Sequence, residues 1–419
     1  MLSKRFKPVF LSAVAVGFIG VSAAYVVVPT EISASSAVTP VSSSPKNTIS
    51  HNNEPSPYVA VNSFDAKFTV AVAKHKIPGA VYTIIEGSDI SRQGAVGTRA
   101  VGARLPVSKN TVFRIASVSK TFSAELAALL ISEGKFSWDD AVIDAVPSFK
   151  VRSKGHAARV KVKHLLSHSV GLTPNSYDNM LEDGWALDKI IPRFGTLKPI
   201  CKPGTCYGYQ NIAFSFIQPI IEKSTGASFE SLMQDRLFNP LEMGDSSMGL
   251  EGFLSEADRA EPHVYSRKGW HRVTVKPHYY NVAPAAGVNA SAEDMAKWVR
   301  AQMGYNKDIL AESLLETVTA KRVKTRREMR KRNWRPHLKE AHYGYGWRIY
   351  KIGGEEIIMH AGGVSGFRSL IGYSKKRRVG LVIMMNAETR SINQLGSEFW
   401  ASLVAEPMAT GSHTVTAGR

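Results

Sequence analysis

The sequence predicts an α/β protein of the α+β type, in which helices flank an antiparallel sheet and a mostly helical domain is inserted into it. Strand patterns occur near both ends of the folded chain, helix patterns fill the middle, and glycine-bearing turns join the last strands. Strands that are adjacent in sequence and joined by short turns pair antiparallel. Two strand regions separated by helices therefore predict one split α/β part and one inserted helical part.

Residues 1–30 have the composition of a targeting segment and lie outside the predicted fold. Three cations among the first seven residues precede an uncharged, apolar run at residues 8–30. The Val-Ser-Ala at residues 21–23 offers a signal-peptide cleavage site, and the run is also long enough to be an uncleaved membrane anchor. A basic N-terminus stays cytoplasmic in both cases, so we expect the remainder to be exported, with inner-membrane association if residues 8–30 are retained.

The chain is strongly basic, with a formal net charge of +18 over 419 residues. No zinc-ligand spacing, RNA-binding aromatic motif or basic-region heptad accompanies this charge, so we expect no nucleic-acid partner. A basic exported protein suits a location near anionic membrane or cell-wall polymer.

Composition also divides the rest of the chain. Residues 31–57 are rich in Ser, Thr, Pro and Asn, which predicts a disordered linker. The folded domain is expected at residues 58–405 and a tail at residues 406–419. Within the domain we place the α/β part at about 58–135 and 343–405, and the helical part at about 136–342.

The first α/β stretch predicts a helix, two strands and a second helix. The first helix is expected over residues 64–76, ahead of a Pro-Gly pair, and the strands over residues 81–85 and up to residue 101. A stripe of apolar residues at helical period then predicts a helix from Ser117 to Gly134, where glycine suits the C-terminal cap.

The remaining elements follow from the same patterns. Helices are expected at 138–142, 162–169, 210–223, 229–238 and 291–303, the last opened by a capping box at Ser291. The basic run at residues 321–339 is expected to be a solvated face or loop. Four strands, at 345–350, 355–360, 367–373 and 379–385, and a closing helix at 392–404 complete the domain.

Ser117 and Lys120 are the first candidate catalytic residues. In a helix their three-residue spacing puts both side chains on one face, within hydrogen-bond reach. A serine at a helix N-terminus can donate its own backbone N–H to a developing oxyanion, while an adjacent desolvated lysine takes its proton. A second S-x-x-K, at residues 43–46, lies in the predicted linker, so the motif needs further support.

That support comes from two later motifs. Tyr209-Gln210-Asn211 and His360-Ala361-Gly362 follow the Ser117 motif in that order. Together they resemble the S-x-x-K, Y-x-N and K/H-x-G motifs of the class C serine β-lactamase and D-alanyl-D-alanine carboxypeptidase-like superfamily, which includes esterases. The resemblance covers roughly residues 58–404 and implies a β-lactamase/transpeptidase-like fold.

Competing copies of two motifs also occur. Tyr177-Asp178-Asn179 is another Y-x-N, and Lys351-Ile352-Gly353 is another K-x-G. Tyr209 is preferred because a Pro-Gly-Thr stretch precedes it and an apolar helix follows. His360 is preferred because it ends an apolar strand and leads into a glycine-rich turn.

The resemblance implies acyl transfer and assigns the roles. Ser117 would attack a carbonyl while Lys120 and Tyr209 share the proton transfers, with either a neutral lysine or a tyrosinate as the base. The backbone N–H groups of Ser117 and Gly363 would form the oxyanion hole. Asn211 would hold a carbonyl of the substrate.

His360 and Gly362 complete the predicted substrate-binding set. His360 stands where many members of the superfamily have lysine. If it faces a substrate carboxylate, its protonated imidazole would bind that group and binding would weaken as pH rises through about 6.5.

Cys201 and Cys206 are the only cysteines, and in an exported protein their spacing predicts a small disulfide loop just before Tyr209. No cofactor or metal is expected, because His164 and His168 lack a third ligand.

The expected function is an exported serine hydrolase, periplasmic or otherwise extracytoplasmic, that forms an acyl-enzyme with amide, β-lactam or ester carbonyls. Its substrate would be a small molecule or a cell-wall peptide. A carboxylesterase of the same fold and a non-catalytic penicillin-binding sensor, which is acylated and stalls, remain alternatives.

Overall fold

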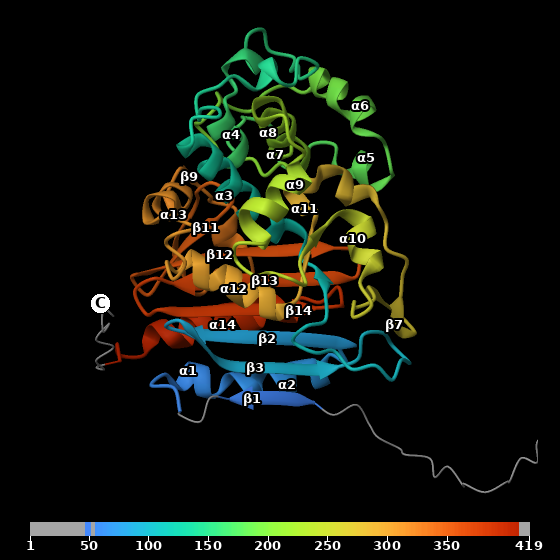
Figure 1. Ribbon diagram of the computed structural model, residues 1–419, viewed down its shortest axis with the longest axis vertical. Helices are drawn as coiled ribbons and strands as arrows, with labels where there is room; N and C mark the ends of the chain where they lie inside the picture. Colours follow the sequence, from blue (N-terminus) through green and yellow to red (C-terminus); the bar gives the residue numbers. More distant parts are fainter. Residues whose placement is uncertain (1–46, 52–54, 410–419) are drawn as a thin grey trace, which may run out of the picture. The chain divides into compact units, whose positions relative to one another are not determined.

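A nine-stranded antiparallel sheet forms the centre of the computed structural model, which describes residues 47–51 and 55–409 (Figure 1). The strands are β1 (Thr48–His51), β2 (Gly79–Glu86), β3 (Asp89–Gly97), β9 (Val323–Lys324), β10 (Leu338–Tyr343), β11 (Arg348–Ile352), β12 (Glu355–Val364), β13 (Phe367–Ser374) and β14 (Val379–Met385). They lie in the order β1-β3-β2-β14-β13-β12-β11-β10-β9. Strands from the two ends of the chain therefore meet at the β2–β14 pair.

Helices cover both faces of this sheet. One face packs against α1 (Val59–Asn62), α2 (Phe64–Lys74) and α14 (Ser391–Ala405), and the other against α12 (Ala292–Gln302). The alternation of side chains along β2 serves both layers: Tyr82 lies in the core under α2, whereas Val81 lies in the core under α12. The antiparallel sheet with flanking helices confirms the predicted fold class.

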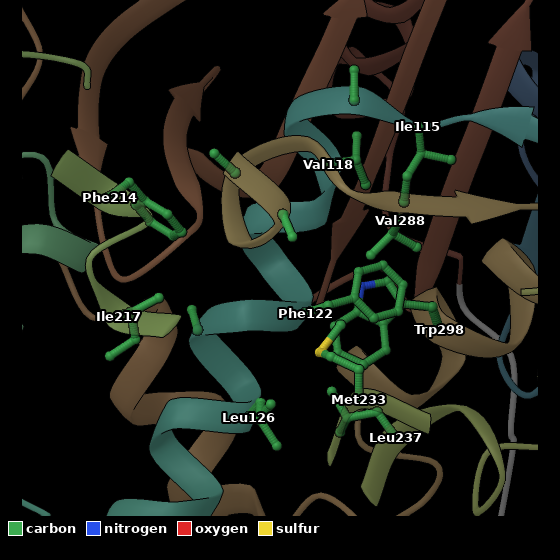
Figure 2. Packing of buried hydrophobic residues seen from close by; sticks show 14 of the residues in the cluster. Ile115, Val118, Phe122, Leu126, Phe214, Ile217, Met233, Leu237, Val288 and Trp298 are labelled. Carbon is green, nitrogen blue, oxygen red and sulfur yellow. The ribbon is translucent and has the colours of Figure 1, made fainter. Parts of the chain in front are cut away.

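The helix that carries Lys120 is α3 (Ser119–Ser132), and it is enclosed by other elements. Phe122 of α3 stacks on Trp298 of α12 with ring centroids 3.9 Å apart (Figure 2). Gly134, with φ of +74°, follows the end of α3 as predicted. The stacking of Phe122 on Trp298 therefore helps to hold the first turn of α3 in place.

The middle of the chain consists of short helices and two small sheets. The helices are α4 (Val162–Leu166), α5 (Asp178–Glu182), α6 (Leu187–Ile190), α7 (Asn211–Phe214), α8 (Ile217–Thr225), α9 (Phe229–Met233), α10 (Gly249–Ser255), α11 (Ala283–Ala286) and α13 (Glu312–Thr319). The 3-10 turns are η1 (Ala116–Val118), η2 (Val142–Asp144), η3 (Ala157–Arg159), η4 (Ile191–Thr196), η6 (His278–Val282) and η7 (Glu328–Arg330), and η5 (Gln234–Phe238) is a π-helical turn. One small sheet has the order β4 (Phe113–Arg114), β8 (Val288–Ala290), β5 (Ser247–Met248), and the other is the hairpin of β6 (His263–Ser266) and β7 (Gly269–Arg272).

Three sequence predictions of local structure are wrong. Residues 48–51, assigned to the disordered linker, form β1, which pairs with β3 at the sheet edge. The segment 138–142 contains no α-helix, because Asp140 accepts a hydrogen bond from the Ser137 N–H and closes a turn, and only Val142 enters the 3-10 turn η2. The predicted helix 210–223 is broken into α7 and α8 near Ser215, whose hydroxyl bonds the Asn211 carbonyl.

The basic run at residues 321–339 is more than a solvated loop. It includes β9, η7 and the start of β10, and it buries the side chains of Glu328 and Trp334. The α/β part therefore begins upstream of residue 343.

The predicted targeting segment at residues 1–30 and residues 410–419 of the predicted tail lie outside the described residues. Among the described helices, none is both long enough and apolar enough to cross a bilayer.

Candidate active site

Ser117 lies in η1, at the junction between β4 and α3. Ala116 just before it has φ of +49°, a conformation that costs a non-glycine residue free energy and needs support from its surroundings. Ser119 provides such support, since its hydroxyl donates to the Ala116 carbonyl at 2.7 Å and accepts from the Val288 N–H at 3.0 Å. Ser117 is partly accessible, whereas Ala116 and Val118 are buried. The turn therefore presents one hydroxyl to a ligand.

Lys120 is completely buried directly behind Ser117. Its Nζ lies 3.3 Å from Ser117 Oγ, 2.7 Å from Asn211 Oδ1 and 2.9 Å from the Ala285 carbonyl oxygen. Burial lowers the pKa of Lys120 well below its usual value. The two carbonyl oxygens accept the two protons of a neutral amine, which leaves its lone pair for the Ser117 hydroxyl. The amine is thus placed to act as a base.

Asn211 holds Lys120 and is itself held by Asp178 of α5. The Asn211 amide nitrogen donates to Asp178 Oδ2 at 2.7 Å, while its oxygen accepts from Lys120. Burial raises the pKa of Asp178, whose other oxygen has no partner among the described residues. The structure thus gives Asn211 a positioning role, and its contact with a substrate carbonyl stays a prediction. Asp178 belongs to the competing Y-x-N copy, so sequence reasoning missed it.

Tyr209 contacts both Ser117 and Lys120. Ser117 is close enough to the Tyr209 hydroxyl to lower its pKa, and the Tyr209 ring centroid lies 4.8 Å from Lys120 Nζ. Burial raises the pKa of Tyr209, although the charge of Arg348 opposes this. Tyr209 therefore keeps its proton at neutral pH, which favours Lys120 over a tyrosinate as the base.

Arg348 is a buried cation that sequence reasoning missed. Its guanidinium carbon lies 5.5 Å from the ring centroids of both Tyr209 and Tyr343. Nη1 pairs with Glu328 at 2.9 Å and donates to the Tyr207 hydroxyl at 3.3 Å. Two signals could have found this pair: Arg348 directly follows the Tyr-Gly-Tyr-Gly-Trp stretch, and Glu328 is the sole acid between residues 321 and 339.

Glu328 keeps its charge in this buried setting. Burial by itself would raise its pKa, but the charges of Arg348 and Lys331 lower the pKa of Glu328 to about 2. Lys331 Nζ lies 2.7 Å from its carboxylate. Glu328 and Arg348 therefore form a charged ion pair, and its guanidinium lies next to the Tyr209 ring.

His360 is fully buried, which differs from the sequence prediction that it faces the substrate. Its Nδ1 lies 3.0 Å from the Ala361 carbonyl oxygen, so Nδ1 carries the proton and Nε2 accepts from the Tyr343 hydroxyl at 3.0 Å. Burial is the main cause that lowers the pKa of His360 well below its usual value, and the nearby charges of Arg348 and Lys120 lower it further. In this position a neutral imidazole orients Tyr343 and supplies no cation for a carboxylate.

His168 packs against Tyr209 and bonds the backbone beside it. Its Nδ1 accepts from the Gln210 N–H at 3.2 Å, and its ring centroid lies 4.2 Å from that of Tyr209. The Gly208 N–H bonds the His168 carbonyl oxygen at 2.8 Å. These contacts fix the backbone on which Tyr209 lies.

Gly362 allows β12 to pass next to the nucleophile. A Cβ atom at this position would lie 2.2 Å from the Ile115 carbonyl oxygen and 3.1 Å from the Ser117 nitrogen, so only glycine fits. Gly363, the next residue, is exposed and lines a cavity of about 400 Å³. The predicted oxyanion hole, formed by the N–H groups of Ser117 and Gly363, stays a prediction.

Three cations line the cavity beside Gly363, namely Arg114, Lys276 and Arg368, together with Tyr279. Glu182 and Glu388 also line it, and Glu388 pairs with Arg368. Arg114 is 3% exposed and donates to the Lys276 carbonyl at 3.3 Å. Its Nε and Nη2 atoms have no hydrogen-bond partner among the described residues.

The predicted disulfide between Cys201 and Cys206 is present, with Cα atoms 6.2 Å apart. It closes the loop that precedes Tyr207. Within the described residues, no cluster of His, Cys, Asp and Glu side chains could hold a metal ion. His164 instead accepts from the Lys161 N–H at 3.1 Å at the start of α4.

A protein-family model described as Beta-lactamase matches residues 64–403. Protein flp of Staphylococcus aureus (strain MW2) is 24% identical over 326 residues, which cover 77% of this chain and 62% of that protein. Unguisins hydrolase ungD of Aspergillus violaceofuscus (strain CBS 115571) is 24% identical over 351 residues, which cover 77% and 61%. The chain therefore spans less than two thirds of the length of these relatives.

Two solved structures are similar over most of the chain. The octameric penicillin-binding protein homologue from Pyrococcus abyssi superposes with a TM-score of 0.70 at 26% identity, covering 81% of this chain and 76% of that one. The D-stereospecific amidohydrolase from Streptomyces sp. has a TM-score of 0.64 at 21% identity, covering 81% and 98%, and shows the fold alone.

Proposed function

The chain belongs to the Beta-lactamase family, and on that basis we propose that it is an exported serine hydrolase that cleaves amide bonds through an acyl-enzyme on Ser117. The observation that carries this proposal is the buried Lys120 amine, 3.3 Å from Ser117 Oγ, with its two protons directed at carbonyl oxygens. A buried amine in that arrangement can deprotonate a serine at neutral pH.

Acylation begins when Lys120 takes the Ser117 proton and Oγ attacks the substrate carbonyl. The resulting oxyanion would lie against the N–H of Ser117 and an N–H of β12. When the tetrahedral intermediate collapses, the carbon–nitrogen bond breaks and Tyr209 donates its proton to the leaving nitrogen. Lys120 then returns a proton to Tyr209, so both groups recover their starting states.

Deacylation repeats these steps with water. A water molecule attacks the ester carbon, loses its proton to the Lys120–Tyr209 pair, and Ser117 leaves with a proton restored. One water is consumed for each bond cleaved.

Two features favour amide over ester substrates. Amine leaving groups need a proton as the bond breaks, whereas alkoxides of activated esters do not. Tyr209 lies close to Ser117, and burial raises the pKa of Tyr209, so it keeps the proton that an amide requires. The charge of Arg348 would stabilise the tyrosinate that forms after this transfer.

The substrate class that fits is a small molecule or peptide with an anionic group near the scissile bond. Arg114 and Lys276 line the cavity next to Gly363, and their positive charge suits a carboxylate there. A cell-wall peptide ending in a free carboxylate meets this description, as does a penicillin.

Export rests on residues 1–30, which have the pattern of a signal peptide or anchor, and on the disulfide at Cys201, which is typical of an oxidising compartment. Fractionation of cells that express the full chain tests this. We expect the protein outside the cytoplasm, and a reduced, cytoplasmic protein would contradict export.

The catalytic proposal is tested with purified wild type and Ser117→Ala against three substrates: a D-alanyl-D-alanine peptide, a penicillin and a nitrophenyl ester. We expect turnover by wild type and none by the variant. A single labelling by penicillin with no turnover of any substrate would favour the penicillin-binding sensor instead. Faster turnover of the ester than of both amides would favour the carboxylesterase.

A further inference from the structure

A second cavity, of about 890 Å³, lies at the end of α2 and the start of α14, with the β6–β7 hairpin as one wall. Ser117, Lys120 and Tyr209 do not line it. We call it the basic groove, because Lys74, Lys76, Arg332 and Arg390 line it.

These four cations are exposed and available to a ligand. Within residues 47–51 and 55–409, none of them forms an ion pair with a carboxylate. The acids of the groove already have partners: Glu388 accepts from the Gly366 N–H and pairs with Arg368, and Glu398 accepts from a neighbouring glutamine. The groove therefore attracts anions.

Two aromatic rings stand among these charges. Tyr265 is 66% exposed, although most tyrosines bury more of their ring, and Trp270 packs against it with ring centroids 5.1 Å apart. The Trp270 indole N–H donates to the His75 carbonyl at 2.9 Å, which fixes the ring. The exposed Tyr265 ring and the fixed, half-buried Trp270 ring offer apolar faces on which the C–H faces of sugars can pack.

The basic groove adjoins the cavity that Gly363 lines. Glu388 lines both the groove and that cavity. A long ligand in the groove would therefore extend toward Gly363.

We propose that the basic groove binds a carboxylated glycan strand and so delivers an attached peptide to Ser117. The choice of a glycan rests on the proposed amide hydrolysis. A glycan that carries peptides would offer sugars and carboxylates to the groove and amide bonds to Ser117. A membrane surface fits less well, because the cations line a concave site. Single-stranded nucleic acid fits less well because the two rings meet at 73° and cannot stack on successive bases.

The test measures binding of fluorescently labelled, soluble peptidoglycan strands to the catalytically inactive Ser117→Ala protein. We expect saturable binding that weakens as salt is raised, since exposed charges are screened. A chitin oligosaccharide, which shares the sugar backbone but lacks carboxylates, should bind at least tenfold more weakly, by roughly the strength of two or more charged contacts.

The key variant is the triple change Lys74→Gln, Arg332→Gln and Arg390→Gln. We expect it to weaken strand binding by about tenfold or more, while the rate at which small penicillins acylate Ser117 in the otherwise wild-type protein is unchanged. The matched control is Lys150→Gln, Arg152→Gln and Lys154→Gln, which removes the same charge from exposed positions outside the groove. Tyr265→Ser, a change without charge, should also weaken binding.

Equal weakening in both triple variants would overturn the proposal, because it would show only an effect of net charge. So would tighter binding of single-stranded DNA or of phosphatidylglycerol vesicles than of the strands. Strand binding does not need the Ser117 hydroxyl, so a failed acylation assay and a failed binding assay report separately on the catalytic proposal and on the groove.

Discussion

In the proposed mechanism, the protonation of Lys120 controls attack by Ser117. The Lys120 amine is buried, and burial lowers its pKa. The charge of Asp178 raises the pKa of Lys120, and the charge of Arg348 lowers it. The neutral amine is the active form, so acylation should be constant at neutral and alkaline pH and fall only as acid protonates Lys120. A lysine with an ordinary pKa near 10.4 would instead give a rate that rises throughout this range.

This first prediction is checked with a neutral nitrophenyl ester, which has no charge of its own to titrate. Acylation rates are measured by stopped flow from about pH 5 to about pH 9, a range set by the usual pKa values of the groups involved. Lys120→Met should lower the plateau by about 10²- to 10⁴-fold, the usual contribution of a general base. A wild-type rate that still climbs above neutral pH would contradict the role.

Tyr209 is predicted to matter more for amides than for activated esters. Because its buried hydroxyl lies close to Ser117 and keeps its proton, Tyr209→Phe removes the acid that, in the proposed mechanism, protonates a leaving amine. We expect turnover of a D-alanyl-D-alanine peptide to fall about 10²-fold or more and that of a nitrophenyl ester to fall much less. Equal losses on both substrates, measured as kcat/KM, would remove Tyr209 from the leaving-group step.

Arg348 is predicted to supply the positive charge that a lysine would carry at position 360 and that the neutral His360 lacks. His360 is neutral and bonded to Tyr343, while Arg348 lies 5.5 Å from the Tyr209 ring. Arg348→Met should therefore slow acylation, and adding His360→Lys, which restores the K-x-G form of the motif, should recover part of the rate. The measurement is acylation by a penicillin in the single, double and His360→Lys proteins.

Two controls accompany that comparison. Glu328→Gln in the Arg348→Met background removes the acid left without its arginine, so a stability loss can be separated from a catalytic one. Thermal unfolding of each variant is measured alongside. If His360→Lys rescues nothing while the double variant remains folded, the cation acts only at the position of Arg348.

At the scale of elements, η7 is joined to the sheet by the buried ion pair between Glu328 and Arg348 of β11. The folded pKa of Glu328 is about 2, below the value near 4.3 of an unfolded chain. The pair therefore stabilises the fold above about pH 4.3, and this stabilisation is lost as pH falls toward about 2. The shift corresponds to about 3 kcal/mol.

Urea unfolding at several pH values tests this. Glu328→Gln should lower the free energy of unfolding at neutral pH, and its difference from wild type should narrow as the solution becomes acidic. Glu230→Gln, an exposed carboxylate on α9, is the control and should differ little from wild type at any pH. A gap between Glu328→Gln and wild type that is independent of pH would contradict a buried, charged Glu328.

Elements with strong local patterns could be predicted, and those fixed by distant partners could not. The strands β12, β13 and β14 follow from apolar runs between turns, and Ser291 caps the start of α12, since its hydroxyl accepts from the Asp294 N–H. By contrast, β1 exists because its backbone pairs with β3, and nothing in its own Thr-Ile-Ser-His sequence requires that. Tertiary pairing determined this element.

At the scale of the whole molecule, the ordered motifs predicted Ser117, Lys120 and Tyr209, which the fold brings together, because each has a distinctive sequence neighbourhood. The groups around them were missed, although two sequence signals pointed to Arg348 and Glu328. Asp178, Glu328 and Arg348 come from separate segments that only the fold brings together, and their importance depends on burial, which single residues in a sequence do not display. His360 is the opposite case. The sequence motif identifies the residue, but its burial lowers its pKa and keeps the imidazole neutral, which the motif does not show.

The central claim is that Ser117 forms the acyl-enzyme, and peptide mass mapping after brief reaction with a penicillin tests it most directly. We predict that the added mass lies on the peptide that contains Ser117, is absent from Ser117→Ala, and persists in Ser119→Ala, whose hydroxyl supports the turn but does not react. An adduct on any other residue, or turnover that survives Ser117→Ala, would contradict the account.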